Sequence, residues 1–466
     1  MKIILFILLI LPPQIGLADN GDFVRVMGAF GIASQYCAWD LRYFDFAQFQ
    51  FDILEPNRFF SGMLLVSSHL FAIAITKVLN MLFFSQEIFD IRFLSILYCI
   101  TFLVSIFFIT KALQTKGKCP VIDLILAFFF IFVASDARNI VYFNSFYSEP
   151  FAFVCFFAAV AFVVWVIKED TSPRMKKVCW IGFTFFIVAF LTAKPQYTVT
   201  SIPLSASILT YCLLTQRKIK RWALMTCAFL LFSSVFAFLI TPSSIASHTL
   251  FNSVFNGMLR DVDDASERLK AMGLDDRFLP FVNQQIYFVW DTEGFDELQA
   301  EFEKQVSRRT VLVHYATNPS EFIRRMENTA AVMFDNIGAS ASLLGNFHYS
   351  QNPEPRVQNT LFTGYSQAKA LLPHTLFFII PFYALYVFIL VLTYRKSKEY
   401  RSIIWILFTI ALMGVTQFPL PVLANGETDI GKQLFFFNLT FDISLAGFLS
   451  ITLHHLYLRF FSCFHR

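Results

Sequence analysis

The chain has 466 residues, of which 56% are hydrophobic and 15% are charged, and its formal net charge is +4 at pH 7. This composition excludes a soluble globular domain, because apolar runs of roughly 17 to 25 residues, long enough to span a membrane, recur along the sequence. The basic residues form short clusters between these runs, as in cytoplasmic loops, so we expect no nucleic-acid partner.

The first apolar segment, residues 1–17, precedes two carboxylates, Asp19 and Asp22. The segment is typical of either a cleaved signal peptide or an uncleaved first helix. In both cases the two aspartates lie on the outer face, where the membrane ends and water begins. Asp19, Asn20 and Gly21 are compatible with a simple helix stop. Two carboxylates at a membrane surface also suit a catalytic site, and both interpretations stay open at this point.

The next apolar run, 59–84, carries polar residues at near-helical spacing, among them His69, Thr76 and Asn80. If this run crossed the membrane, every later basic loop would face outward, against the positive-inside rule. We therefore expect an amphipathic helix that lies in the outer membrane interface.

We expect about ten transmembrane helices in an all-α polytopic membrane protein, namely the first segment and nine further apolar runs: 92–113, 120–135, 150–168, 178–194, 197–215, 222–241, 373–394, 402–420 and 434–457. This topology places the basic clusters inside. The predicted organisation is an N-terminal membrane domain (1–241) with a first outer loop (18–91), a small, mostly helical extracytoplasmic domain (242–372) and C-terminal membrane helices (373–466).

The second outer loop contains Arg138, Asn144, Tyr147 and Glu149, the last directly before Pro150. A carboxylate at this position can simply complement the dipole of the helix that follows. The loop also suits a substrate or acceptor site, because sugar sites combine aromatic faces with hydrogen-bonding groups.

Two lysines stand at the outer ends of predicted spans, Lys194 before Pro195 and Lys432 before the last span. Each can be a snorkelling lysine, or it can hold a lipid-linked phosphate at the membrane surface. Glu427 lies in the same last outer loop as Lys432. Asp442 lies deeper in the last span, where an ionised group needs a partner, and we expect that partner among Lys432, Lys194 and Arg138.

The sequence contains no zinc or haem spacing, no P-loop, no dinucleotide glycine fingerprint and no nucleophile elbow. We therefore expect no cofactor. A divalent metal is compatible with the sequence, but nothing in it requires one.

Several short stretches, in order across almost the whole chain, resemble those of the bacterial glycan-biosynthesis hexose transferases called WsfD-like, within the GT-C type of polyprenyl-phosphate-sugar glycosyltransferases. The stretches are Ala18 to Phe23 (ADNGDF), Asn144 to Pro150 (NSFYSEP), Lys194 to Gln196 (KPQ), Val254 to Leu259 (VFNGML), Leu344 to Phe347 (LGNF) and Glu427 to Asn438 (ETDIGKQLFFFN). Gln433 departs from the histidine associated with this family, which puts a direct role of that side chain in doubt.

The resemblance implies a GT-C-like fold and an enzyme that transfers a hexose from a polyprenyl-phosphate sugar to a cell-envelope glycan or lipid-linked acceptor. The reaction would take place at the outer face of a bacterial inner membrane, among membrane lipid. In GT-C enzymes an acidic residue of the first outer loop is the catalytic base or binds metal, a role that maps here to Asp22 or Asp19.

A transfer of this kind needs a carboxylate to accept the proton of the acceptor hydroxyl and a cation to stabilise the departing phosphate. We assign the cation to Lys194, assisted by Arg138 or Lys432, and expect an inverting single displacement. The other predicted substrate-binding residues are Asn144, Tyr147, Glu149 and Glu427.

Two other function classes stay open. A transporter or flippase of a lipid-linked sugar or small solute would carry more of its polar groups at mid-span, whereas here they gather at loop and helix ends on one face. A structural subunit of an envelope-glycan assembly complex would not need the carboxylates.

Overall fold

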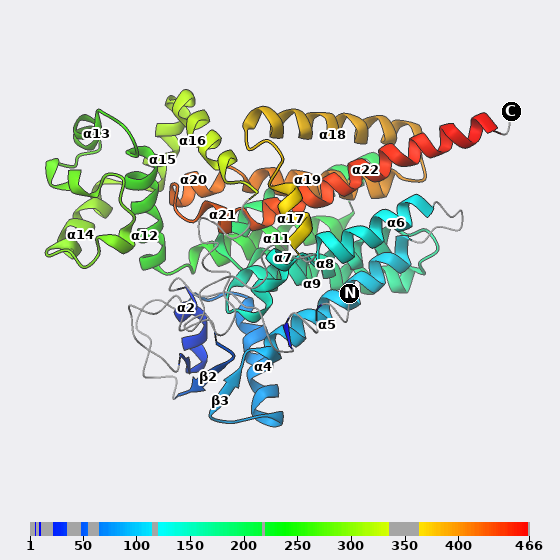
Figure 1. Ribbon diagram of the computed structural model, residues 1–466, viewed down its shortest axis with the longest axis horizontal. Helices are drawn as coiled ribbons and strands as arrows, with labels where there is room; N and C mark the ends of the chain where they lie inside the picture. The colour runs from blue at the N-terminus through cyan, green and yellow to red at the C-terminus, as the bar shows by residue number, and fades with distance from the viewer. Residues whose placement is uncertain are drawn as a thin grey trace.

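The computed structural model describes residues 5, 9–10, 22–34, 48–54, 65–113, 120–216, 220–334 and 363–464, without the side chains of 120–122 and 457–464. Long helices run side by side along the longest axis, and shorter helices gather at one end, as Figure 1 shows. The prediction of an all-α polytopic membrane protein is confirmed.

Seven helices of the described residues are long and apolar enough to cross a membrane: Arg92–Leu113 (α5), Ser148–Ile167 (α8), Pro195–Thr215 (η6 and α10), Arg221–Leu239 (α11), Leu376–Lys396 (α18), Arg401–Asn425 (α19 and α20) and Phe435–Leu456 (within α22). A bent pair, Asp123–Val133 and Ala137–Asn144, makes up to eight if it is one span. The helix α9 (Pro173–Leu191) packs beside α8, but basic residues occupy its first turns. The predicted first helix lies largely outside the described residues.

The full bounds of α22, which contains the last span, are Phe435–Phe464. The other helices are short or contribute to the spans: α2 (Val24–Met27), η1 (Gly28–Phe30), α4 (His69–Phe83), α6 (Pro120–Phe128), η4 (Phe129–Val133), α7 (Ala137–Ile140), η5 (Val141–Asn144), η6 (Pro195–Thr200), α10 (Ser201–Gln216), α12 (Ser243–Ser253), η7 (Val254–Met258), α13 (Ala265–Ala271), η8 (Asp276–Phe281), η9 (Ile286–Phe288), α14 (Phe295–Gln305), α15 (Arg308–Thr317), α16 (Pro319–Ala331), α17 (Gly364–Lys369), α19 (Arg401–Gln417), α20 (Leu420–Asn425) and α21 (Ile430–Gln433). The strands are β1 (Ile32–Ala33), β2 (Gln50–Ile53) and β3 (Ile88–Asp90).

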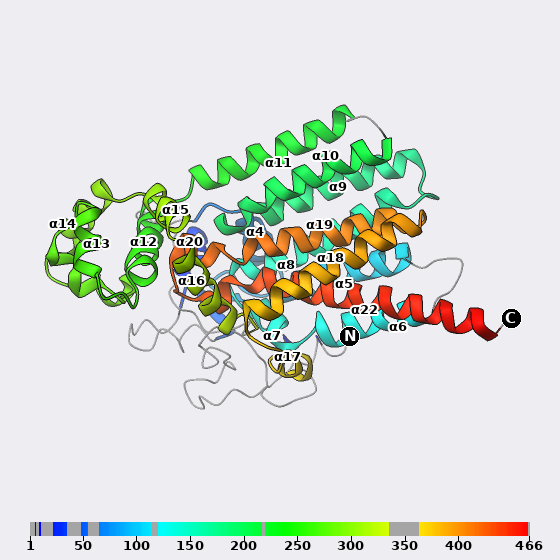
Figure 2. The ribbon, with the colours of Figure 1, turned by 90° about the horizontal axis from the view of Figure 1, so that it is seen from above.

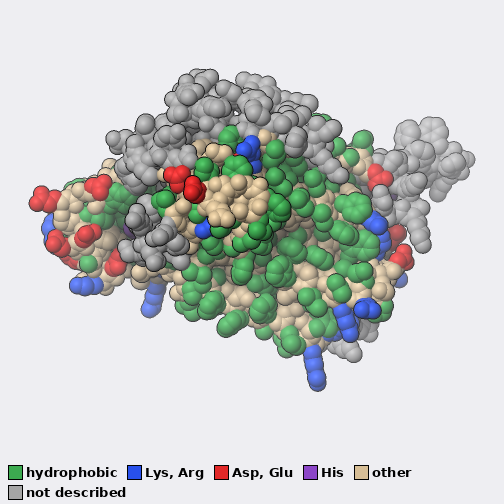
Figure 3. All heavy atoms as spheres, turned by 90° about the horizontal axis from the view of Figure 1, so that it is seen from below, with side chains coloured by type: hydrophobic (Ala, Val, Ile, Leu, Met, Phe, Trp, Pro, Cys, Tyr) green, Lys and Arg blue, Asp and Glu red, His purple; other side chains and the backbone are tan. Residues whose placement is uncertain are grey.

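The long helices are apolar on their outward faces as well as their inward ones. Phe377 of α18 and Leu239 of α11 are 89% and 72% exposed, which is costly in water but favourable in lipid. In Figure 3 hydrophobic side chains cover the middle of the face shown, and charged side chains lie mainly toward its two ends. This distribution is the one expected of a bundle that crosses a bilayer.

The helices α9, α10 and α11 lie together along one side of the bundle, as Figure 2 shows, with α18, α19 and α22 beside them. The helices α19 and α22 approach closely at Gly414. A Cβ atom there would overlap the hydroxyl of Thr440 and lie 2.7 Å from its Cβ atom. A small residue at this crossing therefore sets the distance between the two helices.

The segment predicted as the first outer loop contains a three-stranded antiparallel sheet in the order β1-β2-β3, which the all-α prediction did not include. Ile32 pairs with Ile53, and Phe51 pairs with Phe89. The sheet packs Phe51 and Phe89 into the core, where both are fully buried.

The helix α4 begins at His69, later than the predicted 59, and residues 55–64 lie outside the described part of the chain. Its polar stripe faces the protein. His69 shares a hydrogen bond of 2.8 Å with Tyr98, and Asn80 donates to the carbonyl of Ile88 at 2.8 Å. The opposite face is apolar and open, with Phe71 72% exposed. This orientation is compatible with a helix at the membrane interface, which stays a prediction.

The helices α12 to α16 form a lobe at one end of the bundle, within the predicted segment 242–372. Its core is aromatic, and Phe255 packs against Phe251 and Phe302. These side chains belong to one continuous buried cluster with Tyr386 of α18 and Phe441 of α22. The lobe is therefore packed onto the membrane helices through a shared core.

Candidate functional site

Asp22 lies at the centre of a group of charged side chains near one end of the long helices. Its Oδ2 atom is 2.6 Å from Nζ of Lys432, and its Oδ1 atom is 2.7 Å from Nη1 of Arg25. The Asp22 side chain is 29% exposed, whereas that of Lys432 is 11% exposed. The carboxylate is thus open to a molecule from outside while it is held by two cations.

Aromatic packing next to Asp22 fixes the backbone of this segment. Phe23 is fully buried, and its ring meets those of Phe146 and Tyr147 at 5.5 and 4.9 Å. Tyr147 also lies under Lys432, whose Nζ atom is 4.7 Å from the ring centroid. One aromatic side chain of the second outer loop therefore supports both members of the Asp22–Lys432 pair.

A second ion pair joins Glu149 to Lys194, with 2.7 Å between Oε1 and Nζ. Glu149 lies in the first turn of α8 and is 2% exposed, and Lys194 lies where Pro195 begins a new helix and is 23% exposed. The buried carboxylate thus holds a partly exposed ammonium group. We define the Asp22 cluster as Asp22, Arg25, Tyr147, Glu149, Lys194 and Lys432.

The two ion pairs influence one another electrostatically. Burial by itself would raise the pKa of Asp22, but Lys432, Arg25 and Lys194 together hold that pKa well below its usual value. Burial works to lower the pKa of Lys432, and the charges of Asp22, Asp429 and Glu149 raise it well above its usual value. Asp22 and Lys432 are therefore both ionised at neutral pH, and the resting carboxylate is a weak Brønsted base.

Hydrogen bonds connect the Asp22 cluster to the segments around it. The side chain of Gln196 donates to the carbonyl of Gln433 at 2.8 Å, which ties the Lys194 segment to the Lys432 segment. The Gln433 side chain donates to the carbonyl of Thr428 at 2.8 Å and closes its own loop. Arg25 donates to the hydroxyl of Tyr287 in the lobe at 3.2 Å.

Two predicted site residues of the second outer loop lie apart from these ion pairs. The Asn144 amide donates to the carbonyl of Leu9 at 3.1 Å and accepts from Ser95, so this buried side chain joins the loop to the first segment and α5. The Arg138 backbone N–H donates to the carboxylate of Asp136, which caps α7. Within the part of the chain that the structure describes, Asp22 forms its ion pairs with Lys432 and Arg25, and no ion pair joins it to Arg138.

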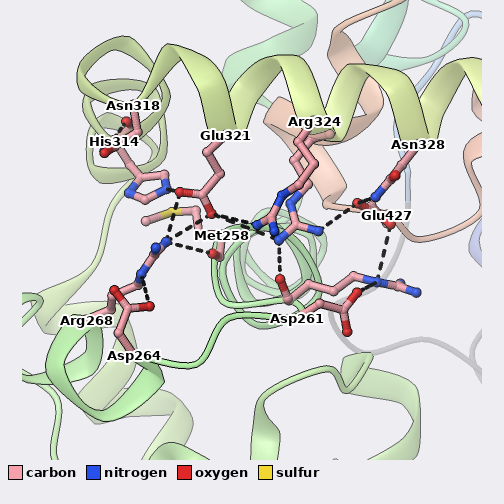
Figure 4. Close-up of polar contacts among 12 residues, drawn as sticks. Met258, Asp261, Asp264, Arg268, His314, Asn318, Glu321, Arg324, Asn328 and Glu427 are labelled. Carbon is pink, nitrogen blue, oxygen red and sulfur yellow. Dashed lines mark hydrogen bonds and ion pairs between the residues drawn. The ribbon is translucent and has the colours of Figure 1, made fainter. Parts of the chain in front are cut away.

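Glu427 belongs to a different network. Its Oε1 atom accepts from Arg325 at 3.1 Å and from Asn328 at 2.8 Å, and its Oε2 atom is 3.3 Å from Arg260. Figure 4 shows Glu427 at one end of a row of charged side chains that continues through Glu321. Glu427 therefore anchors the loop before α21 to the lobe, and its predicted contact with substrate gains no support from this position.

The same loop comes close to the lobe at its backbone. Gly426 has a φ of +61°, and a Cβ atom there would lie 2.8 Å from the carbonyl oxygen of Asn256. The Glu427 N–H donates to that same carbonyl at 2.9 Å. The loop that leads into Lys432 is thus held by backbone as well as side-chain contacts.

The prediction for Asp442 was wrong. Its partner is Lys369 of α17, at 2.7 Å, and Tyr365 donates a further hydrogen bond of 2.7 Å. Neither Lys432 nor Lys194 reaches it, because both already pair with carboxylates at the helix ends. The helix α17, which ends at Lys369, supplies the buried cation instead.

A family model described as the YfdI N-terminal transmembrane domain matches residues 1–462, nearly the whole chain. The chain belongs to the YfdI N-terminal transmembrane domain family. No curated protein and no solved structure gave a match.

Some residues of the site in this YfdI-family chain were missed by sequence reasoning. Arg25 follows Asp22 by three residues, a spacing at which opposite charges pair on a helix. The sequence therefore contained a signal for the Asp22–Arg25 ion pair. Tyr287 carries no such signal, since it is 262 residues from Arg25. Asp19, the other predicted catalytic residue, lies outside the described residues.

Among the residues that the structure describes, no group of three or more His, Cys, Asp and Glu side chains could hold a metal ion. The candidate site is thus composed of two ion pairs, an additional arginine and a supporting tyrosine.

Proposed function

We propose that the protein is a membrane glycosyltransferase that moves a hexose from a polyprenyl-phosphate sugar to a cell-envelope glycan or lipid-linked acceptor. The observation that carries this proposal is the Asp22 cluster, in which the partly exposed Asp22 carboxylate pairs with Lys432, while Lys194, held by Glu149, helps to lower the pKa of Asp22. Membership of a transmembrane-domain family is compatible with it. The proposed location is the outer face of a bacterial inner membrane.

In this proposal Asp22 is the catalytic base. The acceptor hydroxyl gives its proton to the Asp22 carboxylate as its oxygen forms a bond to the anomeric carbon. The bond from that carbon to the phosphate oxygen breaks, and the polyprenyl phosphate departs with the electron pair. Attack from the face opposite the phosphate inverts the anomeric configuration.

Lys432 and Lys194 are suited to bind the phosphate of the donor and to stabilise its additional charge as it leaves. Glu149 is too buried, at 2% exposure, to meet an acceptor, so it acts as a positioning residue for Lys194. Tyr147 does the same for Lys432 through its ring.

Donor binding is expected to make Asp22 a stronger base. A phosphate that attracts Lys432 weakens the interaction that holds the pKa of Asp22 low, and the carboxylate then competes better for the acceptor proton. The pKa of Asp22 should therefore be higher in the donor complex than in the free protein.

This difference gives a pH prediction. A lowered pKa keeps the base ionised until the pH falls below the ordinary aspartate value of about 4, so the acid limb of kcat/KM, which reports the free enzyme, should lie below that value. The acid limb of kcat reports the complex and should lie at higher pH. Initial rates of hexose transfer between acid and neutral pH provide the measurement, and coincident limbs would contradict the proposal.

The proposal is tested by reconstituting the purified protein in vesicles with a panel of polyprenyl-phosphate sugars carrying radiolabelled hexose. Lipid and glycan extracts serve as acceptors, and vesicles without the protein are the control. We expect protein-dependent transfer from at least one donor. Absence of transfer from every donor and acceptor would overturn the assignment.

One observation favours a transporter as the second candidate. The Lys369–Asp442 pair is buried within the helices, with side chains 2% and 1% exposed, as charges along a translocation path would be. Tyr365 and Lys369 already satisfy one oxygen of this carboxylate, which is also how a structural ion pair behaves. Uptake of lipid-linked sugar into the same vesicles distinguishes this alternative.

A further inference from the structure

The helices α8, α9, α10, α11 and α19 line a half-open cavity of about 760 Å³. Most of its lining is apolar, including Phe156 and Ile187 at one end and Ile167 at the other. Phe156 follows Glu149 on α8 by about 10 Å along the helix axis. Phe156 packs against Phe436, with their ring centroids 5.1 Å apart, and no residue of the Asp22 cluster lines the cavity. The cavity is therefore separate from the Asp22 cluster.

The far end of the cavity is basic. Lys176 and Lys177 come from the first turns of α9, and Lys220 precedes the first residue of α11. The described residues that line the cavity include no aspartate or glutamate. Three lysines thus line one end of an apolar space, and none of the described residues lining it carries a carboxylate.

Aromatic and hydroxyl groups accompany these lysines. The rings of Trp180 and Trp222 lie 4.2 Å apart, and Nζ of Lys220 lies 5.9 Å from the Trp222 ring. The hydroxyls of Tyr211 and Ser402 share a hydrogen bond of 2.6 Å within the lining. Tryptophan, tyrosine and lysine together are typical of the level of lipid headgroups.

We propose that this cavity binds one acyl chain of an anionic phospholipid, whose phosphate headgroup lies against Lys176, Lys177 and Lys220. The apolar part of the cavity removes the chain from contact with polar groups, and the three lysines complement the headgroup charge. Such a lipid comes from the leaflet next to the basic helix ends, opposite the Asp22 cluster. Its binding does not depend on the proposed transferase activity.

The test uses the full-length protein in phosphatidylcholine vesicles that contain increasing amounts of phosphatidylglycerol with brominated acyl chains. Bromine quenches tryptophan fluorescence at short range, and Trp180, Trp222 and Trp405 line the cavity. We expect brominated phosphatidylglycerol to quench at a mole fraction roughly tenfold lower than brominated phosphatidylcholine does. Equal quenching by the two lipids would overturn the proposal.

Two substitutions locate the bound chain. Trp405→Phe should lower the selective part of the quenching, because Trp405 lies in the cavity wall. Trp290→Phe should leave it unchanged, because Trp290 lies in the lobe next to Tyr287. Selective quenching that is equally strong in the Trp405 variant would place the lipid elsewhere and overturn the proposal.

Charge-matched variants test the headgroup site. Replacing Lys176, Lys177 and Lys220 with glutamine should abolish the preference for the anionic lipid. The control replaces three exposed basic residues at the end of α18 that do not line the cavity, namely Arg395, Lys396 and Lys398. A preference lost equally in both variants would show a general charge effect and overturn the proposal. The proposal would also be overturned if a polyprenyl phosphate displaced the brominated lipid at a lower mole fraction than an anionic phospholipid does.

Discussion

Replacing Asp22 with asparagine is expected to lower hexose transfer by about 10²- to 10⁴-fold, the usual contribution of a general base. Asparagine keeps the shape of the side chain and still offers an oxygen to Arg25 and Lys432, but it cannot accept the acceptor proton. The loss should appear in kcat at saturating donor. Initial rates in vesicles with matched amounts of protein provide the measurement.

The matched control is Asp296→Asn, which removes an exposed carboxylate from α14 in the lobe. It should transfer hexose as the wild type does. The thermal unfolding of both variants in detergent separates catalysis from folding. An Asp22→Asn protein that is folded and fully active would exclude Asp22 as the base, and Asp19→Asn assayed alongside it tests the other candidate.

Replacing Asp442 with asparagine is expected to destabilise the protein by about 3–5 kcal/mol, because it leaves the Lys369 ammonium buried without its carboxylate. The Lys369 side chain is 2% exposed, so water cannot replace the lost partner. Its Nζ atom also lies 5.3 Å from the ring of Phe334, a contact too weak to neutralise the charge. Chemical unfolding of the purified protein in detergent measures the change.

The double variant Lys369→Met, Asp442→Leu distinguishes a lost ion pair from general damage to the packing. It removes both charges and keeps apolar volume, so it should recover most of the lost stability. Lys396→Gln, an exposed lysine at the end of α18, is the surface control and should change little. A double variant as unstable as the Asp442→Asn protein would contradict the expected role of the pair.

Much of the site was already visible in the order of apolar and charged residues. The lengths of the apolar runs predicted the long helices, because a helix must be apolar for the thickness of a bilayer to be stable there. The alternation of basic and acidic loops then placed Asp22, Glu149, Lys194 and Lys432 on one side. The structure brings these four side chains together in two ion pairs.

The sequence did not show which cation of that group pairs with which carboxylate. Asp22 pairs with Lys432 across 410 residues, while Lys194, predicted as the main phosphate ligand, is held by Glu149. Which cation meets which carboxylate depends on how the helices pack, and that packing is decided by contacts such as Gly414 against Thr440. The partners of Glu427 were not predictable from sequence either, since they are arginines supplied by the lobe.

By itself the sequence determined the membrane class, the approximate spans and the grouping of the polar loops at one end of the helices. These follow from local composition, because each transmembrane helix must satisfy its backbone hydrogen bonds within itself and present apolar side chains to the lipid. Only the tertiary structure decided that the polar stripe of α4 faces inward, that Lys369 pairs with Asp442 and that a basic cavity opens between α8 and α19. Each of these depends on side chains from distant segments, because a buried polar group takes whichever partner the packing brings within reach.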